Sequence, residues 1–306
     1  MKRINLGKTD LKVPVVAVGC MRINKLTVKE AEHFLKTAMD SGANFFDHAD
    51  IYGGGECESI FGKAMNITPS SREKMIIQSK CGIVPGVMFD FSKEHIITSA
   101  QESIKRMGCE YLDVLLLHRP DTLVEPEEVG EAFDYLKSNG LVHHFGVSNQ
   151  NVGQIKLLRT GLNVPICANQ MQLSVTDCTM IKSGINVNMS NESALDRDGG
   201  ILEFCRTEGI TIQPWSPFQH GFFKGTFIDN PNFEELNKTL EKIGECYGVS
   251  KTTICIAWLL RHPAHFQPIV GTMNEARLQE CIKAADIILS RQEWYEIYMS
   301  AGNILP

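Results

Sequence analysis

Four side chains in the first half of the sequence have the chemistry needed to move a proton to or from an oxygen atom: Asp47, Tyr52, Lys80 and His118. Tyrosine is a poor acid at neutral pH because its free pKa is about 10, but a neighbouring ammonium group favours the phenolate and lowers that pKa. Lys80 could supply the charge and Asp47 could hold the ammonium in place, which would make Tyr52 a usable general acid or base. His118 could donate a hydrogen bond to a substrate oxygen and stabilise a developing alkoxide.

Together, these four residues predict an enzyme that reduces a carbonyl or oxidises an alcohol. No protein side chain donates a hydride, so the reaction would require a nicotinamide cofactor. Each residue alone has a plainer explanation, since a lysine can end a strand in solvent, a histidine can be structural and an aspartate can cap a helix. Their occurrence together favours chemistry, because burying these groups without mutual partners would be costly.

The elements that must position these residues alternate between strands and helices along the chain. The expected strands cover residues 15–19, 44–50, 75–80, 112–118, 143–148, 167–172, 210–215 and 268–272. The expected helices cover residues 27–40, 56–65, 93–107, 127–138, 151–159, 198–208, 236–247, 252–261 and 275–285. Eight units with near-continuous apolar strands predict one α/β domain over residues 1–306, a closed (β/α)₈ TIM barrel. A hairpin over residues 4–13 should precede the barrel, and an extra helix over residues 291–300 should follow it.

A barrel of this kind would bring the polar strand ends together at one mouth, where active sites of such barrels lie. The expected strand ends carry Asp47, Lys80, His118, Ser148, Asn149, Gln170, Trp215 and Ser216. The long connections 174–198 and 216–232 are expected to serve this site. An open doubly wound sheet is the alternative fold, but no Gly-x-Gly-x-x-Gly follows the first strand, which counts against its dinucleotide-binding form.

The order and spacing of these residues resemble the aldo-keto reductase family over about residues 1–290. Asp47 and Tyr52 lie five positions apart, as in the family, and Lys80 and His118 each end a strand like the family's lysine and histidine. Further segments that resemble the family are 146–149, 169–170, 215–217 and 271–280. The segments 119–121 and 196–200 are similar to bacterial YdhF-like oxidoreductases within it.

This resemblance implies an enzyme that reduces an aldehyde or ketone to an alcohol with NADPH. Carried onto this sequence, it makes Tyr52 the proton donor, Lys80 and Asp47 the residues that tune it, and His118 the residue that orients the carbonyl. The implied cofactor is NADP(H), with NAD(H) as the weaker alternative. The residues implied to hold it are Ser148, Asn149, Gln170, Trp215, Ser216, Phe218, Gly221, Phe222, Gly271, Thr272, Arg277 and Glu280.

The sequence departs from many family members at the end that would hold the adenosine. Gly271 and Met273 flank Thr272 where many members have a basic residue, which leaves Arg277 as the main cation for the 2′-phosphate. Cys281 stands where many members have an asparagine. We therefore expect NADPH to be preferred over NADH by less than in members with two cations at this position.

Two other functions fit parts of the sequence. His48, Asp50 and His118 could belong to a metal-dependent hydrolase, but such sites take several ligands from different strands. The later strands offer Gln170 and Trp215 instead, so we expect no metal site. The second alternative is a sensor or regulatory barrel that binds a nicotinamide cofactor with little turnover, since a shared fold does not guarantee activity.

The expected substrate is a small carbonyl compound, which the sequence does not name. Five phenylalanines are candidates either to line an apolar pocket or to close loops over the barrel: Phe89, Phe91, Phe218, Phe222 and Phe223. The sequence likewise gives no basis for an oligomeric state.

Composition narrows the class of partners. The chain has 306 residues, a formal net charge of -6 and no basic block, so neither nucleic acid nor an anionic membrane is an expected partner. No apolar run approaches the roughly 20 residues of a membrane span. We see no signal peptide and no Cys-x-x-Cys among the ten scattered cysteines, which predicts mostly buried thiols in a cytoplasmic protein.

Overall fold

The computed structural model describes all 306 residues, Met1–Pro306, around one sheet of parallel strands. The strands are β3 (Ala17–Gly19), β4 (Phe45–Asp47), β5 (Ile76–Cys81), β8 (Leu112–Leu117), β9 (Val142–Ser148), β10 (Ile166–Gln172), β11 (Thr211–Trp215) and β12 (Ile269–Val270). Their order is β11-β10-β9-β8-β5-β4-β3-β12. The two ends of this order, β11 and β12, are also neighbours. The N–H of Gln267, just before β12, donates to the carbonyl of Ile212 in β11 at 3.1 Å. The predicted (β/α)₈ barrel is therefore confirmed.

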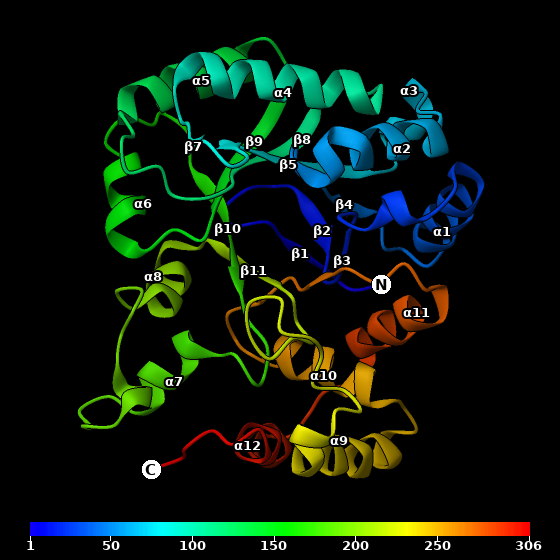
Figure 1. The fold of residues 1–306 in the computed structure, drawn as a ribbon, viewed down its shortest axis with the longest axis vertical. Coiled ribbons are helices and arrows are strands. Elements are labelled where there is room, and N and C mark those ends of the chain that lie inside the picture. The colour runs from blue at the N-terminus through cyan, green and yellow to red at the C-terminus, as the bar shows by residue number, and fades with distance from the viewer.

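Helices surround the strands (Figure 1). They are α1 (Val28–Asp40), α2 (Glu56–Met65), α3 (Pro69–Arg72), α4 (Lys93–Met107), α5 (Pro126–Ser138), α6 (Val152–Leu158), α7 (Thr179–Ile185), α8 (Ile201–Glu208), α9 (Glu234–Tyr247), α10 (Lys251–Leu260), α11 (Glu275–Lys283) and α12 (Arg291–Ser300). Several begin at a side chain that caps the first turn. Thr27 accepts from the Glu30 N–H and Ser92 from the His95 N–H, so the sequence itself fixes where α1 and α4 start. None of the helices combines the length and apolar composition that crossing a bilayer requires.

The N-terminal hairpin plugs the end of the barrel where the strands begin. It consists of β1 (Arg3–Asn5) and β2 (Lys12–Pro14), and it contributes Leu6 and Val13 to the small apolar cluster inside the barrel. Gly7 makes the approach possible, because a Cβ there would lie 2.5 Å from the Cys167 carbonyl oxygen. With this end filled, only the end where the strands finish remains open.

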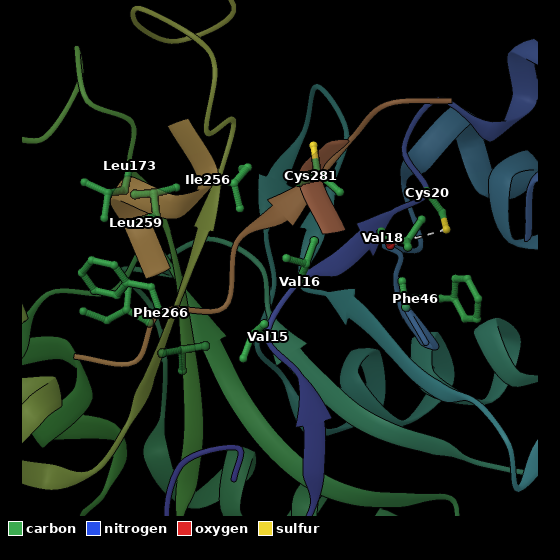
Figure 2. Packing of buried hydrophobic residues seen from close by; sticks show 14 of the residues in the cluster. Val15, Val16, Val18, Cys20, Phe46, Leu173, Ile256, Leu259, Phe266 and Cys281 are labelled. Atoms are coloured by element: carbon green, nitrogen blue, oxygen red, sulfur yellow. Dashed lines mark hydrogen bonds between the residues drawn. The ribbon is translucent and has the colours of Figure 1, made fainter. Parts of the chain in front are cut away.

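Most of the core lies between the barrel and its helices. This layer is one continuous cluster of 65 buried residues, whereas the cluster inside the barrel has 10. Figure 2 shows part of the outer layer, with Val18 and Cys20 from the β3 segment and Ile256 and Leu259 from α10. Burial of apolar surface on both faces explains why the strands read as nearly continuous apolar runs.

Besides the short helix α3, two features lie outside the predicted elements. A small hairpin of β6 (Ile83–Val84) and β7 (Met88–Phe89) follows β5, with a turn in which the Val87 N–H donates to the Val84 carbonyl at 3.0 Å. Pro85 and Gly86 (φ +73°) occupy the turn, a pairing that favours a tight reversal. The second feature is α7, which forms within the long connection that follows β10.

Candidate active site at the open end of the barrel

Strand alternation carries polar side chains from the middle of the barrel to its open end. Along β5, Ile76 lies in the inner apolar cluster, and two and four positions later Gln78 and Lys80 point the same way. Phe45 and Asp47 repeat the step on β4. The barrel interior therefore changes from apolar to charged towards the end where the strands finish.

Lys80 contacts two other members of the predicted catalytic group, Asp47 and Tyr52. Its Nζ lies 2.8 and 2.9 Å from the two carboxylate oxygens of Asp47 and 2.7 Å from the His48 carbonyl. The same nitrogen is 3.2 Å from the Tyr52 hydroxyl oxygen. Lys80 is fully buried and does not line the cavity, whereas Asp47 and Tyr52 do.

The acidity of Tyr52 differs from the sequence-based expectation. Burial raises the pKa of its hydroxyl above the ordinary value, and the positive charge of Lys80 opposes this without cancelling it. Burial also opposes the charge of Lys80, but Asp47 and Tyr52 outweigh it and raise the pKa of the ammonium. Lys80 therefore remains charged, and Tyr52 carries its proton at neutral pH, as a proton donor must.

His118 faces Tyr52 across the cavity. The two ring centroids are 6.0 Å apart with an interplanar angle of 83°. Burial, followed by the charges of Lys80 and Arg119, holds the pKa of His118 well below its usual range, so the imidazole is neutral. Its Nδ1 is buried without a partner, which leaves Nε2 as the nitrogen that a ligand in the cavity can reach.

A chain of buried glutamines holds Asp47 from inside the barrel, and of its members only Gln170 was predicted as a site residue, for holding a carboxamide. The Asp47 Oδ1 accepts from Gln78 Nε2 at 2.7 Å and from Gln170 Nε2 at 2.9 Å. Gln213 Nε2 donates to Gln78 Oε1 at 3.1 Å and to Gln267 Oε1 at 2.9 Å. The signal was present as polar residues at inward positions of otherwise apolar strands.

The open end holds one large cavity of about 1310 Å³. A ligand site for one drug-sized molecule measures about 300–1,000 Å³, so this space suits a dinucleotide and a substrate together. The predicted residues that line it are Asp47, Tyr52, His118, Ser148, Asn149, Gln170, Trp215, Ser216, Phe218, Phe222, Gly271, Thr272, Arg277 and Glu280. Gly221 is not among the lining residues.

At the inner end, the residues expected to hold a carboxamide are already bonded to one another. Asn149 (φ +57°) donates from Nδ2 to Ser148 Oγ at 2.7 Å and accepts from Trp215 Nε1 at 3.1 Å. Gln170 donates only from its Nε2, to Asp47 and Gln213, so its Oε1 remains an unused acceptor. This acceptor fits the amide N–H of a nicotinamide.

At the outer end, the cavity is bordered by two helix N-termini. Ser250 caps α10 and Asn274 caps α11, and both line the cavity. Arg277 is exposed there and its side chain has no partner, while Arg22 donates to the Gly271 carbonyl at 3.2 Å. Helix N-termini and arginines favour an anion, so this end fits the phosphates of a dinucleotide. Sequence reasoning missed Arg22 and Ser250, of which only the serine had a visible signal as a helix cap.

The expectations for the long connections and the phenylalanines are correct only in part. The connection after β11 supplies Phe218, Phe222 and Phe223 to the cavity wall. Phe89 and Phe91 are not lining residues, because Phe89 is exposed on β7 and Phe91 is buried beneath Gly82.

The connection 174–198 also supplies no lining residue. It braces the neighbouring loop instead, through a hydrogen bond of 2.7 Å from Ser174 Oγ to the Gln219 carbonyl.

Metal-ligating and sulfur chemistry have no assembled site in this structure. No group of three or more His, Cys, Asp or Glu side chains is arranged to hold a metal ion. All ten cysteines are free thiols, and every one except Cys246 is buried.

Comparison with known proteins gives consistent matches over almost the whole chain. The sequence pattern of the Aldo/keto reductase family matches residues 15–300. The chain is 35% identical to the uncharacterized oxidoreductase YcsN of Bacillus subtilis, over 100% of both proteins. It is 31% identical to a 6-dehydroglucose reductase of Agrobacterium fabrum and 31% identical to the oxidoreductase YdhF of Escherichia coli, with 98% of each protein covered in both cases.

A solved structure agrees with these matches. The crystal structure of a thermostable aldo-keto reductase in complex with the inhibitor epalrestat superposes with a TM-score of 0.79 at 26% identity. The match covers 98% of this chain and 100% of that one.

Proposed function

The chain belongs to the aldo/keto reductase family of oxidoreductases, and we propose that it reduces an aldehyde or ketone to an alcohol with NADPH. The observation that carries the proposal is the contact of one buried ammonium, Lys80 Nζ, with both Asp47 and the Tyr52 hydroxyl. This group lies at the base of a cavity of about 1310 Å³ that His118 also lines. We propose that residues 1–306 form the single domain that performs the reaction.

In the proposed reaction, the chemistry that a bound reduced nicotinamide would supply is a hydride for the carbonyl carbon. Tyr52 donates its hydroxyl proton to the carbonyl oxygen, which becomes the alcohol oxygen. The Lys80 ammonium, 3.2 Å from that hydroxyl, stabilises the phenolate that remains. Neutral His118 donates a hydrogen bond from Nε2 to the same carbonyl oxygen and orients it for attack. Reversal of these steps oxidises the alcohol.

The cofactor would extend along the cavity from the inner end to the outer end. Ser148, Asn149 and Gln170 would hold the carboxamide, supported by the unused Oε1 of Gln170. Trp215 would stack against the nicotinamide ring. Ser216, Phe218 and Phe222 would border the pyrophosphate, while Gly271, Thr272, Arg277 and Glu280 would surround the adenosine and its 2′-phosphate; Gly221, which does not line the cavity, is left out of this set.

The proposal is tested by turnover of purified protein with NADPH and a panel of aldehydes and ketones. We expect many equivalents of NADPH to be consumed per protein molecule and an equal amount of alcohol to form. Consumption that stops at one equivalent would instead support a sensor or regulatory barrel. Tight NADPH binding without reduction of any carbonyl in the panel would contradict the proposed activity.

A further inference from the structure

Arg119 lies immediately after His118 in the cavity wall and has no anionic partner in the protein. No hydrogen bond or ion pair involves its guanidinium. The nearest carboxylate in sequence, Asp121, is occupied elsewhere: it accepts from the backbone N–H groups of Phe91 and Leu123 at 2.9 and 2.8 Å. Arg119 is thus a partly buried cation whose five N–H donors are all unused.

Two aromatic rings hold this guanidinium in place. Its Cζ lies 5.9 Å from the ring centroid of Trp215 and 5.8 Å from that of Phe222. The two rings contact each other edge to face, with centroids 6.1 Å apart. A guanidinium over aromatic faces is stabilised without using its N–H groups, so the donors stay available to a ligand.

The other cations of the cavity do not share this position. Lys251 is paired with Asp229, and Arg22 donates to the Gly271 carbonyl. Lys80 is paired with Asp47 and does not line the cavity. Lys25 and Arg277 also lack partners, but Lys25 is exposed in the turn 23–25 after β3 and Arg277 belongs to α11 at the outer end. Arg119 is the free cation beside the reacting groups, close enough that its charge helps to hold the pKa of His118 down.

We propose that Arg119 binds an anionic group of the substrate, so that the enzyme acts on aldehydes or ketones that carry an oxyanion such as a carboxylate. The inference rests on the proposed reductase function and deepens it. A planar guanidinium can pair with a carboxylate through two parallel hydrogen bonds. Phe223, whose ring centroid lies 4.7 Å from that of Phe222, supplies apolar surface for the carbon atoms between the oxyanion and the carbonyl. The competing class is the neutral sugar aldehyde that the name of the Agrobacterium relative describes.

The experiment compares substrates that differ only in charge. We would measure kcat/KM with NADPH for para-carboxybenzaldehyde against para-formylbenzamide, and for succinic semialdehyde against its uncharged amide. We expect the wild type to prefer the charged member of each pair by about 10- to 100-fold, the range of a charge-assisted hydrogen bond. In Arg119→Gln the ratio of charged to uncharged kcat/KM should fall close to one through KM, and Arg119→Lys should restore part of it.

Arg291→Gln serves as the matched control, because Arg291 is exposed at the start of α12, far along the chain from the cavity residues. This variant should keep the wild-type ratio. An equal kcat/KM for charged and uncharged substrates in the wild type would overturn the inference, and so would an equal loss for both in Arg119→Gln.

Two further measurements separate this inference from the proposed function. NADPH affinity, followed by tryptophan fluorescence, should stay within about twofold in Arg119→Gln; a loss of tenfold or more would assign Arg119 to the cofactor instead. Binding of para-carboxybenzyl alcohol to the protein with oxidised cofactor tests the anion contact without turnover. If no carbonyl is reduced, yet this alcohol binds the wild type about tenfold more tightly than Arg119→Gln, the anion site stands and the reductase proposal fails. Equal binding to both proteins would reject the anion site.

Discussion

Lys80 uses all of its hydrogen-bonding capacity within the active site. An ammonium group has three N–H donors, and its neighbours are the Asp47 carboxylate, the His48 carbonyl and the Tyr52 hydroxyl. The contact with Tyr52 is the longest, at 3.2 Å. Asp47 and His48 therefore fix the lysine, while its interaction with the phenol can strengthen when the phenol loses its proton.

The first prediction concerns the proton donor. Tyr52→Phe keeps the ring that packs in the cavity and removes only the hydroxyl that Lys80 contacts. We expect turnover to fall by about 10²- to 10⁴-fold, the usual contribution of general acid catalysis, with NADPH affinity close to that of the wild type. Steady-state kinetics and a fluorescence titration measure the two quantities. Turnover within twofold of the wild type would exclude Tyr52 as the acid.

The second prediction concerns the coupling between Lys80 and Tyr52. Because the ammonium lowers the pKa of the phenol, Lys80→Met should raise it further, which makes Tyr52 a weaker acid. Reduction should become slower, and the pH at which it declines for want of the phenol proton should move upward. The pH–rate profile measures both effects.

The same variant leaves Asp47 buried without its cation, which can itself destabilise the fold by about 3–5 kcal/mol. Lys80→Met combined with Asp47→Asn removes both charges and provides the control. Because the Asp47 carboxylate raises the pKa of Tyr52, the double variant should show a smaller upward shift than Lys80→Met alone. If folded Lys80→Met keeps the wild-type pH–rate profile, the proposed coupling is wrong.

The third prediction concerns the choice of cofactor. The Arg277 side chain is exposed and free, at the N-terminal turn of α11 next to Thr272 in the cavity wall. If it pairs with the 2′-phosphate, Arg277→Ala should weaken NADPH binding by about 1–3 kcal/mol and leave NADH binding unchanged. Titrations that follow tryptophan fluorescence measure both cofactors, with Arg291→Ala as the control. Equal weakening for the two cofactors would reject the phosphate contact.

At the scale of the elements, the glutamine chain makes three strand regions and one loop depend on one another. Gln213 on β11 bridges Gln78 on β5 and Gln267 just before β12, and Gln267 Nε2 donates to the Pro14 carbonyl at 2.8 Å. All three glutamines are fully buried. A barrel interior is usually filled by branched apolar side chains that only pack against one another. Here the three glutamines fill part of it and are also joined by hydrogen bonds.

The fourth prediction follows from this chain of bonds. Gln213→Leu removes the donor to the Oε1 atoms of both Gln78 and Gln267. At about 1–3 kcal/mol for each of the two buried polar groups left without a partner, we expect the free energy of unfolding to fall by about 2–6 kcal/mol. Urea denaturation measures the change, and the exposed Gln101→Leu on α4 is the control. Equal stability of Gln213→Leu and the wild type would show that the bonds contribute nothing net.

The elements themselves were predictable because their signals are local. Apolar runs located the eight barrel strands, and the spacing of apolar residues located the helices between them. The glutamines were visible as polar residues in apolar strands, but the bonds between them were not predictable, since residues 78, 213 and 267 meet only when the barrel closes. Arg119 was visible as a motif, but its placement depends on aromatic rings contributed by the connection after β11. Contacts between distant segments therefore set the limit of what the sequence could predict.

At the scale of the whole molecule, a buried histidine makes stability depend on pH. His48 is fully buried with its ring 4.5 Å from that of Phe61, and neither ring nitrogen has a hydrogen-bond partner. Burial, together with the charge of Lys80, lowers its pKa to about 3. Below about pH 6.5, His48 therefore binds a proton in the unfolded chain but stays neutral in the folded protein. The free energy of unfolding is therefore unaffected by His48 above about pH 6.5, and it decreases as the pH falls from there towards the folded pKa.

The fifth prediction is that His48→Leu reduces this sensitivity to acid. At about pH 5 the proton uptake by unfolded His48 costs the wild type about 2 kcal/mol. The variant removes that cost and also removes two unpartnered nitrogens, so it should be at least as stable as the wild type at neutral pH. Urea denaturation at both pH values measures the difference. Parallel losses in the two proteins would show that His48 does not carry the linkage.

The closure of the barrel also has a consequence for the order of events during synthesis. The first barrel strand to leave the ribosome is β3. It can pair with β4 soon afterwards, but its other neighbour, β12, is formed by residues 269–270 and is made much later. The plugging hairpin is made earlier still, yet its Gly7 packs against Cys167 and Thr211, which come much later. A growing chain therefore exposes an unpaired strand edge and an unfilled barrel for most of its translation. The nascent protein needs protection from association with its neighbours until nearly its last strand has been made.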